Sequence, residues 1–238
     1  MKRSEPLAVI PARLHATRFP RKLLASWRGK TVLEWVWKAT IAAKGFERVL
    51  IATGDEDIRS TAQSFGATVC YDTRTYPNGT ERAAGATEHF TQDVVVVQAD
   101  QPGLSTQHLE QLLMVFRTTT ADMLTACVPL ARDAHNDEDI VKCWEHPTNK
   151  QAVFSRHMPP DPVPCFRHIG LYAYRKPALV RYAASQSCEA EINHRLEQLR
   201  SLQLGMQVRL TTLTQAAPCV DRPDDLQRLD EWFSRSTP

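Results

Sequence analysis

The sequence predicts an α/β fold with a mostly parallel, Rossmann-like sheet and a small β-rich elaboration in its second half. Apolar runs alternate with helical patterns along the first half, which is typical of βαβ units. Val94 to Val97 are four consecutive valines, as expected for a central strand covered by helices on both faces. At 238 residues, with 42% hydrophobic residues, the chain is long enough to bury the core of one such domain.

Four strands and two helices are predicted in the first half. Apolar residues recur at a spacing of about 3.6 residues between Val32 and Ile41, which predicts a helix with one apolar face. A second helix is predicted from Asp57 to Phe65, with Gly66 as its C-cap. The predicted strands are Leu7 to Ile10, Arg48 to Ala52, Thr68 to Tyr71 and Asp93 to Gln98.

The second half carries shorter strands and a proline-rich segment. Four prolines make His157 to Cys165 irregular, and we expect a loop close to the functional site. Helices are predicted at Lys176 to Ala184 and from Glu189 to Gly205. The predicted strands are Met123 to Leu130, Ile140 to Trp144, Ala152 to Ser155, Ile169 to Tyr174 and Val208 to Leu213.

Composition and charge narrow the class of protein. The net charge of +2 is too small, and the basic residues too dispersed, for a nucleic-acid-binding surface. No apolar run approaches the roughly 18 residues of a membrane span, so we expect no membrane anchor and no signal peptide. The six cysteines form no C-x-x-C pair, which favours reduced thiols and a cytoplasmic location.

A cluster of cationic side chains follows the first strand. Arg13, Arg18, Arg21 and Lys22 fall within ten residues, without the glycines of a P-loop. Guanidinium and ammonium groups neutralise phosphates without a tight glycine turn, so a nucleoside triphosphate is the predicted ligand. A solvated basic surface loop is the alternative.

Two isolated carboxylates are candidates for a metal site. Asp100 directly follows the valine strand, where a buried carboxylate is costly unless it is paired or binds a cation. Asp221 follows a second short apolar segment, Cys219-Val220. Two carboxylates together with substrate phosphates are a ligand set that suits Mg²⁺. On pattern alone, the favoured interpretation of Asp221 is the N-cap of a helix over Pro223 to Leu229, ahead of a metal ligand.

Ligands collect at the carboxyl ends of parallel strands. The segments Pro11 to Lys22, Thr53 to Asp57 and Gln98 to Pro102 should therefore converge on one crevice. Further along, Arg156, Arg167, His168 and Arg200 could receive a second substrate that bears a carboxylate, although each has a routine structural alternative.

The chain resembles the 3-deoxy-manno-octulosonate cytidylyltransferases, and more distantly the CMP-acylneuraminate synthetases, from Val9 to Leu226. The order and spacing of the motifs together carry the resemblance. The matching motifs are Ile10-Pro11-Ala12-Arg13, Thr17-Arg18-Phe19-Pro20 with Lys22, Ala52-Thr53 with Asp55-Glu56, Gly79-Thr80-Glu81-Arg82, Gln98 with Asp100 and Pro102, Val141-Lys142, Phe154-Ser155-Arg156, Arg167-His168-Ile169-Gly170-Leu171-Tyr172, Leu196-Glu197-Gln198-Leu199-Arg200, and Val220-Asp221 with Pro223 and Asp225-Leu226.

The resemblance implies a single nucleotidyltransferase domain over residues 1–238 that acts in lipopolysaccharide biosynthesis. This domain would transfer CMP from CTP to an acidic acceptor, a 3-deoxy-manno-octulosonate-type acid sugar, and release diphosphate. It also implies a homodimer formed through an inserted acceptor-side subregion at residues 131–175. Lys22, Arg13 and Asp100 would be catalytic, and Asp100 and Asp221 would hold Mg²⁺. The implied nucleotide-binding residues are Pro11, Ala12, Arg13, Arg18, Lys22, Thr53, Thr80, Arg82 and Gln98, and the implied acceptor-binding residues are Gln98, Arg156, His168, Tyr172 and Gln198.

Several positions depart from the family pattern. Ala16 stands in place of a serine, Arg21 of a glycine, Gly54 of an aspartate, Ala99 of a glycine and His194 of a glutamate. The segment between Arg156 and Arg167 is also shorter and richer in proline than in the family. These departures keep two alternatives open: a smaller acidic acceptor such as a phosphonate, and a nucleotide-binding paralogue with low turnover.

Overall fold

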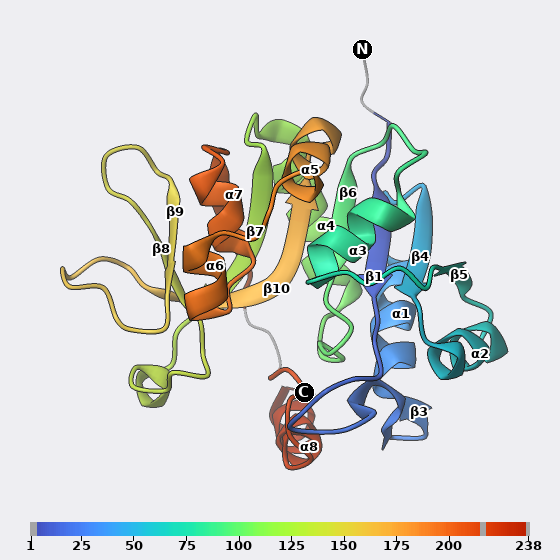
Figure 1. Cartoon of the computed structure of the whole chain (residues 1–238). Helices are drawn as coiled ribbons and strands as arrows, with labels where there is room; N and C mark the ends of the chain where they lie inside the picture. Colours follow the sequence, from blue (N-terminus) through green and yellow to red (C-terminus); the bar gives the residue numbers. More distant parts are fainter. Residues whose placement is uncertain (1–3, 215–217, 237–238) are drawn as a thin grey trace. The chain divides into compact units, whose positions relative to one another are not determined.

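A computed structural model describes residues 4–214 and 218–236 (Figure 1). The chain divides into two compact units, one drawn from residues 1–110 and 216–238, the other from residues 111–215. The expected single domain with an insertion at 131–175 stays a prediction.

The first unit contains a four-stranded parallel sheet in the order β6-β1-β4-β5. Its register places Val9 of the first strand opposite Leu50 on one side and Val96 on the other. Every side chain of the first strand and of the valine strand is buried, because helices cover both faces (Figure 1). The strands are β1 (Leu7–Pro11), β4 (Arg48–Thr53), β5 (Thr68–Tyr71) and β6 (Val94–Val97), and all four predicted strands are confirmed.

The helices of this unit begin and end on recognisable signals. Thr31 caps α1 (Val32–Ala42) by accepting a hydrogen bond from the backbone N–H of Glu34, at 3.1 Å. The helix α2 (Glu56–Ser64) ends before Gly66, whose φ of 87° is left-handed, as predicted for its C-cap region. The unit also contains η1 (Lys22–Leu24), the hairpin β2 (Ser26–Trp27) and β3 (Lys30–Thr31), and α8 (Asp225–Ser236).

Helix α3 (Gly79–Ala86) was not predicted from periodicity. Its signal is a capping pattern, because the Asn78 side chain accepts from the backbone N–H of Glu81 at 2.9 Å. Helix α4 (Thr106–Thr118) was also missed, although Leu109, Leu112 and Phe116 are buried at helical spacing along it.

The second unit is built on a mixed sheet. Strand β10 (Phe166–Tyr174) pairs antiparallel with β7 (Met123–Pro129), and β11 (Val208–Thr212) pairs parallel with β7. A hairpin of β8 (Lys142–Glu145) and β9 (Ala152–Ser155) joins the start of β10. The predicted strands are confirmed. The polar loop after β7 contains the short η2 (Arg132–Ala134).

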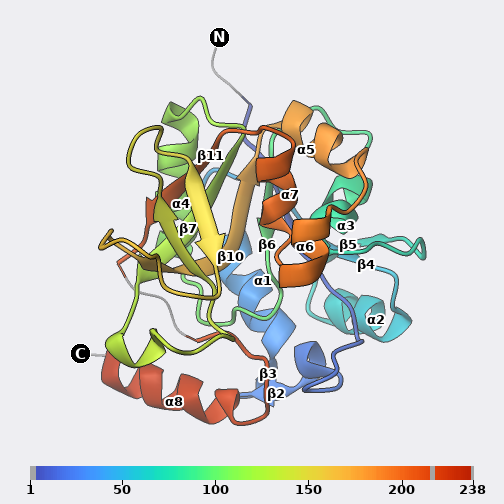
Figure 2. The same cartoon turned by 60° about the vertical axis from the view of Figure 1, so that its left-hand side comes forward.

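The prediction of one helix over Glu189 to Gly205 is wrong. After α5 (Lys176–Ala183) come two short helices, α6 (Glu189–His194) and α7 (Gln198–Gln203) (Figure 2). Arg195 ends α6 in the left-handed region, with φ 54°. The turn lets the buried Arg200 donate to both carboxylate oxygens of Glu191, at 2.6 and 2.7 Å. Since a buried guanidinium needs such a partner, tertiary pairing overrides the continuous helical pattern.

Among the described residues, no helix is both long and apolar enough to cross a bilayer. The six cysteines are free thiols.

Candidate nucleotide site

The first unit contains a cavity of about 290 Å³ at the carboxyl ends of β1 and β6. The loops after these two strands, the start of α3 and the segment before α8 supply its wall. The lining residues are Pro11, Ala12, Arg13, His15, Ala16, Thr17, Arg18, Lys22, Leu23, Tyr76, Asn78, Gly79, Arg82, Gln98, Ala99, Asp100 and Asp221.

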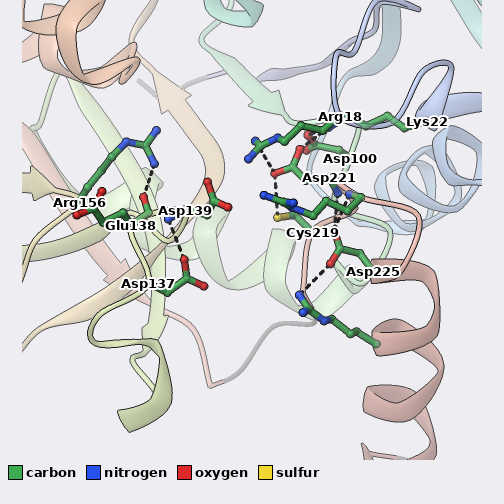
Figure 3. A network of polar contacts seen from close by, with 12 residues as sticks. Arg18, Lys22, Asp100, Asp137, Glu138, Asp139, Arg156, Cys219, Asp221 and Asp225 are labelled. Atoms are coloured by element: carbon green, nitrogen blue, oxygen red, sulfur yellow. Dashed lines mark hydrogen bonds and ion pairs between the residues drawn. The ribbon is translucent and has the colours of Figure 1, made fainter.

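Lys22 forms the electrostatic centre of the cavity (Figure 3). Its Nζ donates to Asp100 Oδ2 at 2.7 Å and to Asp221 Oδ1 at 2.8 Å, and its side chain is only 15% exposed. Burial works against the charge of Lys22, but the two carboxylates outweigh it and raise the pKa of Lys22 above its ordinary value. Lys22 is therefore held as an ammonium group between two carboxylates.

Asp221 is the second anchor of this cluster. Its Oδ2 also faces Arg18 Nη2 at 3.5 Å. Burial alone would raise the pKa of Asp221. Lys22 and then Arg18 together lower this pKa by more than burial raises it, so the pKa of Asp221 lies below its ordinary value. Asp221 is thus ionised throughout the neutral range.

The alternative that Asp221 caps a helix is wrong. The carboxylate that organises the turn before α8 belongs to Asp225, whose Oδ2 accepts from the backbone N–H groups of Asp221 and Arg222 at 2.8 and 2.7 Å (Figure 3). The Asp221 side chain points instead to Lys22. Asp225 therefore holds the backbone of Asp221 in place, and the carboxylate of Asp221 stays available to the cavity.

The remaining cations of the loop separate into two groups. Arg13 and Arg18 line the cavity, and within residues 4–214 and 218–236 Arg13 forms no ion pair with an acidic side chain. Arg21 does not line it, because its guanidinium pairs with Asp57 at 2.8 Å. The expectation that all four cations grip one phosphate chain is therefore wrong for Arg21.

The cavity also brings together other predicted residues. Pro11, Ala12, Arg82 and Gln98 line the cavity. The Ala12 N–H donates to the Ala52 carbonyl at 2.9 Å, so this N–H is already used within the sheet. A Cβ at Gly79 would lie 3.0 Å from Pro11 Cγ, so a glycine there allows the close approach of α3 to β1.

Two predicted nucleotide-binding residues are not at the cavity. Thr53 is buried, and its hydroxyl accepts from the backbone N–H of Asp55 at 3.0 Å. Thr80 is buried in the first turn of α3. Neither side chain lines the cavity. The Thr53 to Asp57 segment instead supports the loop, since Asp55 Oδ2 accepts from the backbone N–H of Leu14 at 2.9 Å.

The departures from the family pattern have local structural consequences. Arg21 adopts a φ of 59°, a left-handed conformation that suits glycine better than arginine. A Cβ at Gly54 would lie 2.7 Å from the carbonyl oxygen of Asp72, so the backbone as it stands excludes a side chain there. Ala16 lines the cavity, Ala99 is buried on its wall, and the His194 carbonyl accepts from Arg156 Nε at 3.2 Å.

The second unit holds the other predicted acceptor residues. The His168 ring lies 5.1 Å from Phe154 and 5.5 Å from Tyr172, centroid to centroid. Tyr172 is buried, and burial followed by the charge of Glu197 raises its pKa. Gln198 is 2% exposed, and its Nε2 has no hydrogen-bond partner among the described residues.

Arg156 lies at the end of the β9 strand. Besides the His194 carbonyl, it donates through Nη1 to the Glu138 carbonyl at 2.7 Å (Figure 3). Two of its donors are thus used within the second unit.

Hydrogen bonding determines the tautomer of His168. The Thr125 hydroxyl donates to the Leu171 carbonyl at 2.9 Å, so it can only accept from His168 Nε2, also at 2.9 Å. Burial lowers the pKa of His168 to about 3. The ring is therefore neutral at physiological pH, with Nδ1 left as an acceptor.

Comparison with known proteins identifies related sequences and structures. The family model described as "Cytidylyltransferase" matches residues 7–208. A 3-deoxy-manno-octulosonate cytidylyltransferase of Methylobacterium radiotolerans is 35% identical over 237 residues, covering 94% of this chain and 95% of the relative. One of Synechococcus elongatus is 35% identical over 240 residues, covering 96% and 98%.

This chain belongs to the 3-deoxy-manno-octulosonate cytidylyltransferase family. A solved CMP:2-keto-3-deoxy-manno-octonic acid synthetase complexed with CTP is similar, with a TM-score of 0.89, 26% identity, and coverage of 98% of this chain and 100% of that one. A cytidylyltransferase of Leptospira borgpetersenii, at 14% identity and a TM-score of 0.68, shares the fold. The predicted family, fold class and nucleotidyltransferase activity are confirmed.

Within this cytidylyltransferase, the donor set of the cavity fits a divalent cation. Asp100 and Asp221 each place a carboxylate oxygen against one cation, the ammonium group of Lys22. No cluster of three or more His, Cys, Asp or Glu in the described parts of the chain could hold a metal alone. Mg²⁺ typically binds through one or two carboxylates and completes its shell with water and substrate phosphates, so this pair is sufficient.

Proposed function

We propose that this chain transfers CMP from CTP to a 3-deoxy-manno-octulosonate-type acid sugar and releases diphosphate. The observation that carries the proposal is the position of Lys22 between Asp100 and Asp221, in a cavity that Arg13 and Arg18 also line. A triphosphate needs such cations, and the cytidylyltransferase relatives that act on 3-deoxy-manno-octulosonate indicate the nucleotide and the acceptor.

The chemistry is an in-line displacement at phosphorus. A hydroxyl oxygen of the acceptor attacks the α-phosphorus of CTP and loses its proton to water. The bond from that phosphorus to the bridging oxygen breaks, and its electron pair leaves with diphosphate. Lys22 and Arg13 offset the negative charge that builds on the phosphate oxygens. Asp100 and Asp221 would hold Mg²⁺, which supplies further charge neutralisation when bound. Because this displacement requires no covalent enzyme intermediate, catalysis is mainly positioning.

The acceptor-binding residues of the second unit favour a hydroxylated acid. His168 Nδ1 is an acceptor, so it suits a hydroxyl group of the ligand better than a carboxylate. The buried Gln198 amide offers an N–H donor with no partner among the described residues. An acid sugar carries both hydroxyl donors and carboxylate acceptors, and Arg156 would receive the carboxylate.

A smaller acidic acceptor remains the second candidate. The segment between Arg156 and Arg167 is short and proline-rich, and Arg156 already donates to two backbone carbonyls. A phosphonate would need fewer contacts than an eight-carbon sugar acid.

Diphosphate release from CTP tests the proposal. We expect release with Mg²⁺ and the eight-carbon sugar acid, and little with phosphonates. Release with a phosphonate alone would favour the second candidate. Binding of CTP without release, across the whole panel of acceptors, would identify a nucleotide-binding paralogue instead.

We further propose a homodimer formed through residues 131–175, and a cytoplasmic location. The family resemblance supports the dimer, and the six free thiols are compatible with a reducing compartment. Light scattering of the purified chain measures the first: a mass of one chain, 26.9 kDa, would exclude the dimer.

A further inference from the structure

Tyr76 lines the nucleotide cavity but has no part in the function proposed above. Its hydroxyl donates to Asp72 Oδ2 at 2.6 Å. Asp72 is anchored in turn, because its backbone N–H donates to the Thr53 carbonyl at 2.8 Å, at the end of β4. Asp72 thereby links the Tyr76 ring to the parallel sheet: its carboxylate binds the hydroxyl, and its backbone binds the end of β4.

The ionisation of this pair agrees with a strong contact. The Tyr76 hydroxyl bond, opposed by burial and assisted by Arg74, lowers the pKa of Asp72 to about 2. Burial and then the hydrogen bond to Asp72 raise the pKa of Tyr76 to about 12. At neutral pH the phenol is a donor and the carboxylate an acceptor, which is what the contact requires.

Two glycines make room for this arrangement. Gly85 lies inside α3, where glycine is a poor helix former. A Cβ there would lie 2.1 Å from Tyr76 Oη and 2.6 Å from Cζ, so the ring occupies the space that a side chain would need. At Gly54, a Cβ would lie 2.7 Å from the Asp72 carbonyl oxygen. Gly85 therefore makes room for the Tyr76 ring, and Gly54 makes room for the backbone of its partner Asp72.

The ring contacts a predicted nucleotide-binding residue. The guanidinium carbon of Arg82 lies 4.9 Å from the centroid of the Tyr76 ring, within the range of a cation–π interaction. Arg82 Nη1 also donates to the Asp72 carbonyl at 3.2 Å. Both contacts hold the Arg82 guanidinium at the cavity wall.

We propose that Tyr76, hydrogen-bonded to Asp72 and packed against Gly85, is a positioning residue that orients Arg82 toward the bound nucleoside triphosphate. This inference rests on the function proposed above. A long arginine loses much rotamer freedom when it binds a ligand, so holding it beforehand should raise the affinity for the nucleotide. The effect should fall on nucleotide binding rather than on the chemical step.

The test compares steady-state kinetics of the full-length chain with CTP as the varied substrate. Tyr76→Leu should raise the KM for CTP about tenfold, with kcat and the acceptor KM within about twofold of the wild type. Tyr76→Phe, which keeps the ring and loses the bond to Asp72, should give an intermediate KM. The matched control is Tyr71→Leu: Tyr71 is exposed, has its own cation–π partner in Arg59 at 4.7 Å, and does not line the cavity.

A double-mutant cycle separates positioning from general packing. If Tyr76 acts through Arg82, Tyr76→Leu should add less than about twofold to the KM of Arg82→Met. Full additivity of the two effects, or an unchanged KM in Tyr76→Leu, would overturn the inference.

Calorimetric titration with CTP distinguishes failure of the proposed function from failure of the inference about Tyr76. Wild-type chain that binds no CTP overturns the proposed function and the inference with it, whereas equal CTP affinity of wild type and Tyr76→Leu overturns the inference alone.

Discussion

The charge of Lys22 depends on the two carboxylates that it joins. Without them, burial would favour the neutral amine, so the three residues act as one electrostatic unit. Removal of any one member leaves the others unbalanced in a partly enclosed site. The contact therefore fixes the charge of Lys22 at the place where the proposed function needs a cation.

Lys22→Met should reduce kcat/KM for CTP roughly 100-fold or more, since one preorganised charge at a phosphoryl centre typically contributes that much. The fold should persist, because Asp100 and Asp221 keep 26% and 38% side-chain exposure and remain partly hydrated. The assay is diphosphate release. The matched control is Lys38→Met, which removes an exposed lysine paired with Glu34. Equal activity of the two variants would exclude Lys22 from the reaction.

Arg21 carries backbone strain that a glycine would relieve. We expect Arg21→Gly to be about 1 kcal/mol more stable than Arg21→Ala, because both lose the ion pair with Asp57 but only alanine keeps the left-handed penalty. The exposed ion pair itself should contribute less than about 1 kcal/mol. Urea unfolding of the two variants measures the difference. A glycine variant no more stable than the alanine variant would show that the loop relaxes in solution.

Most of the residues expected at one crevice do line the cavity, because they follow strand ends, while their roles toward a ligand stay predictions. Arg13, Lys22 and Asp100 follow parallel strands, and topology alone brings such residues to one edge. The cap could not be assigned in advance, because Asp221, Asp224 and Asp225 are chemically equal candidates. Tyr76 was missed for a different reason, because it lies in a loop without periodicity. The space for its ring depends on Gly85 in α3, a helix that was itself missed.

At the scale of the elements, α8 is joined to the hairpin that follows the Lys22 loop. Trp27 Nε1 and Arg28 Nε donate to Asp230 Oδ1 at 3.2 and 2.7 Å. The Phe233 ring packs 5.3 Å from Trp27. Since Asp221 lies just before α8, these contacts anchor the helix that follows the second carboxylate.

Phe233→Ala should loosen α8 and weaken the site. We expect faster amide exchange along α8 and a several-fold higher Mg²⁺ concentration for half-maximal activity, because Asp221 is then less well placed. Mass-spectrometric hydrogen exchange and a magnesium titration are the measurements. Trp37→Leu is the control, since Trp37 packs on Phe65, away from α8. Unchanged magnesium dependence with faster exchange would separate α8 from the site.

The strands were predictable because short apolar runs bounded by polar residues leave few alternatives. The break between α6 and α7 was not, because the pairing of Arg200 with Glu191 is a tertiary contact between positions nine residues apart. A local pattern cannot show that a guanidinium will be buried. Sequence reasoning therefore predicted the strands, missed α4 in spite of its helical spacing, and failed at α6 and α7, where a buried ion pair decides the structure.

At the scale of the whole molecule, the free energy of unfolding should fall with decreasing pH over two separate pH ranges. Asp221 has a lowered pKa and that of Asp72 is about 2, so their contributions are present above about 3.8, the ordinary carboxyl value, and are lost as pH falls below it. His168 has a pKa of about 3 in the folded chain, against an ordinary value of 6.5. Below pH 6.5 the unfolded chain takes up a proton that the native chain refuses, so stability falls there first.

Replacement of His168 by a group that does not titrate should remove the fall in the upper pH range. Between pH 6.5 and 4.5, one such histidine lowers the free energy of unfolding by at most about 1.4 kcal/mol per pH unit. His168→Gln keeps an amide donor for Thr125 and should show a flatter stability curve over that range, with the carboxylate-dependent loss at lower pH unchanged. Urea unfolding at a series of pH values gives the curve, and His89→Gln, at a highly exposed position, should match the wild type. If His168→Gln loses stability between pH 6.5 and 4.5 as steeply as the wild type, His168 is already protonated in the native chain, and its assignment as a neutral acceptor for a ligand hydroxyl fails with it.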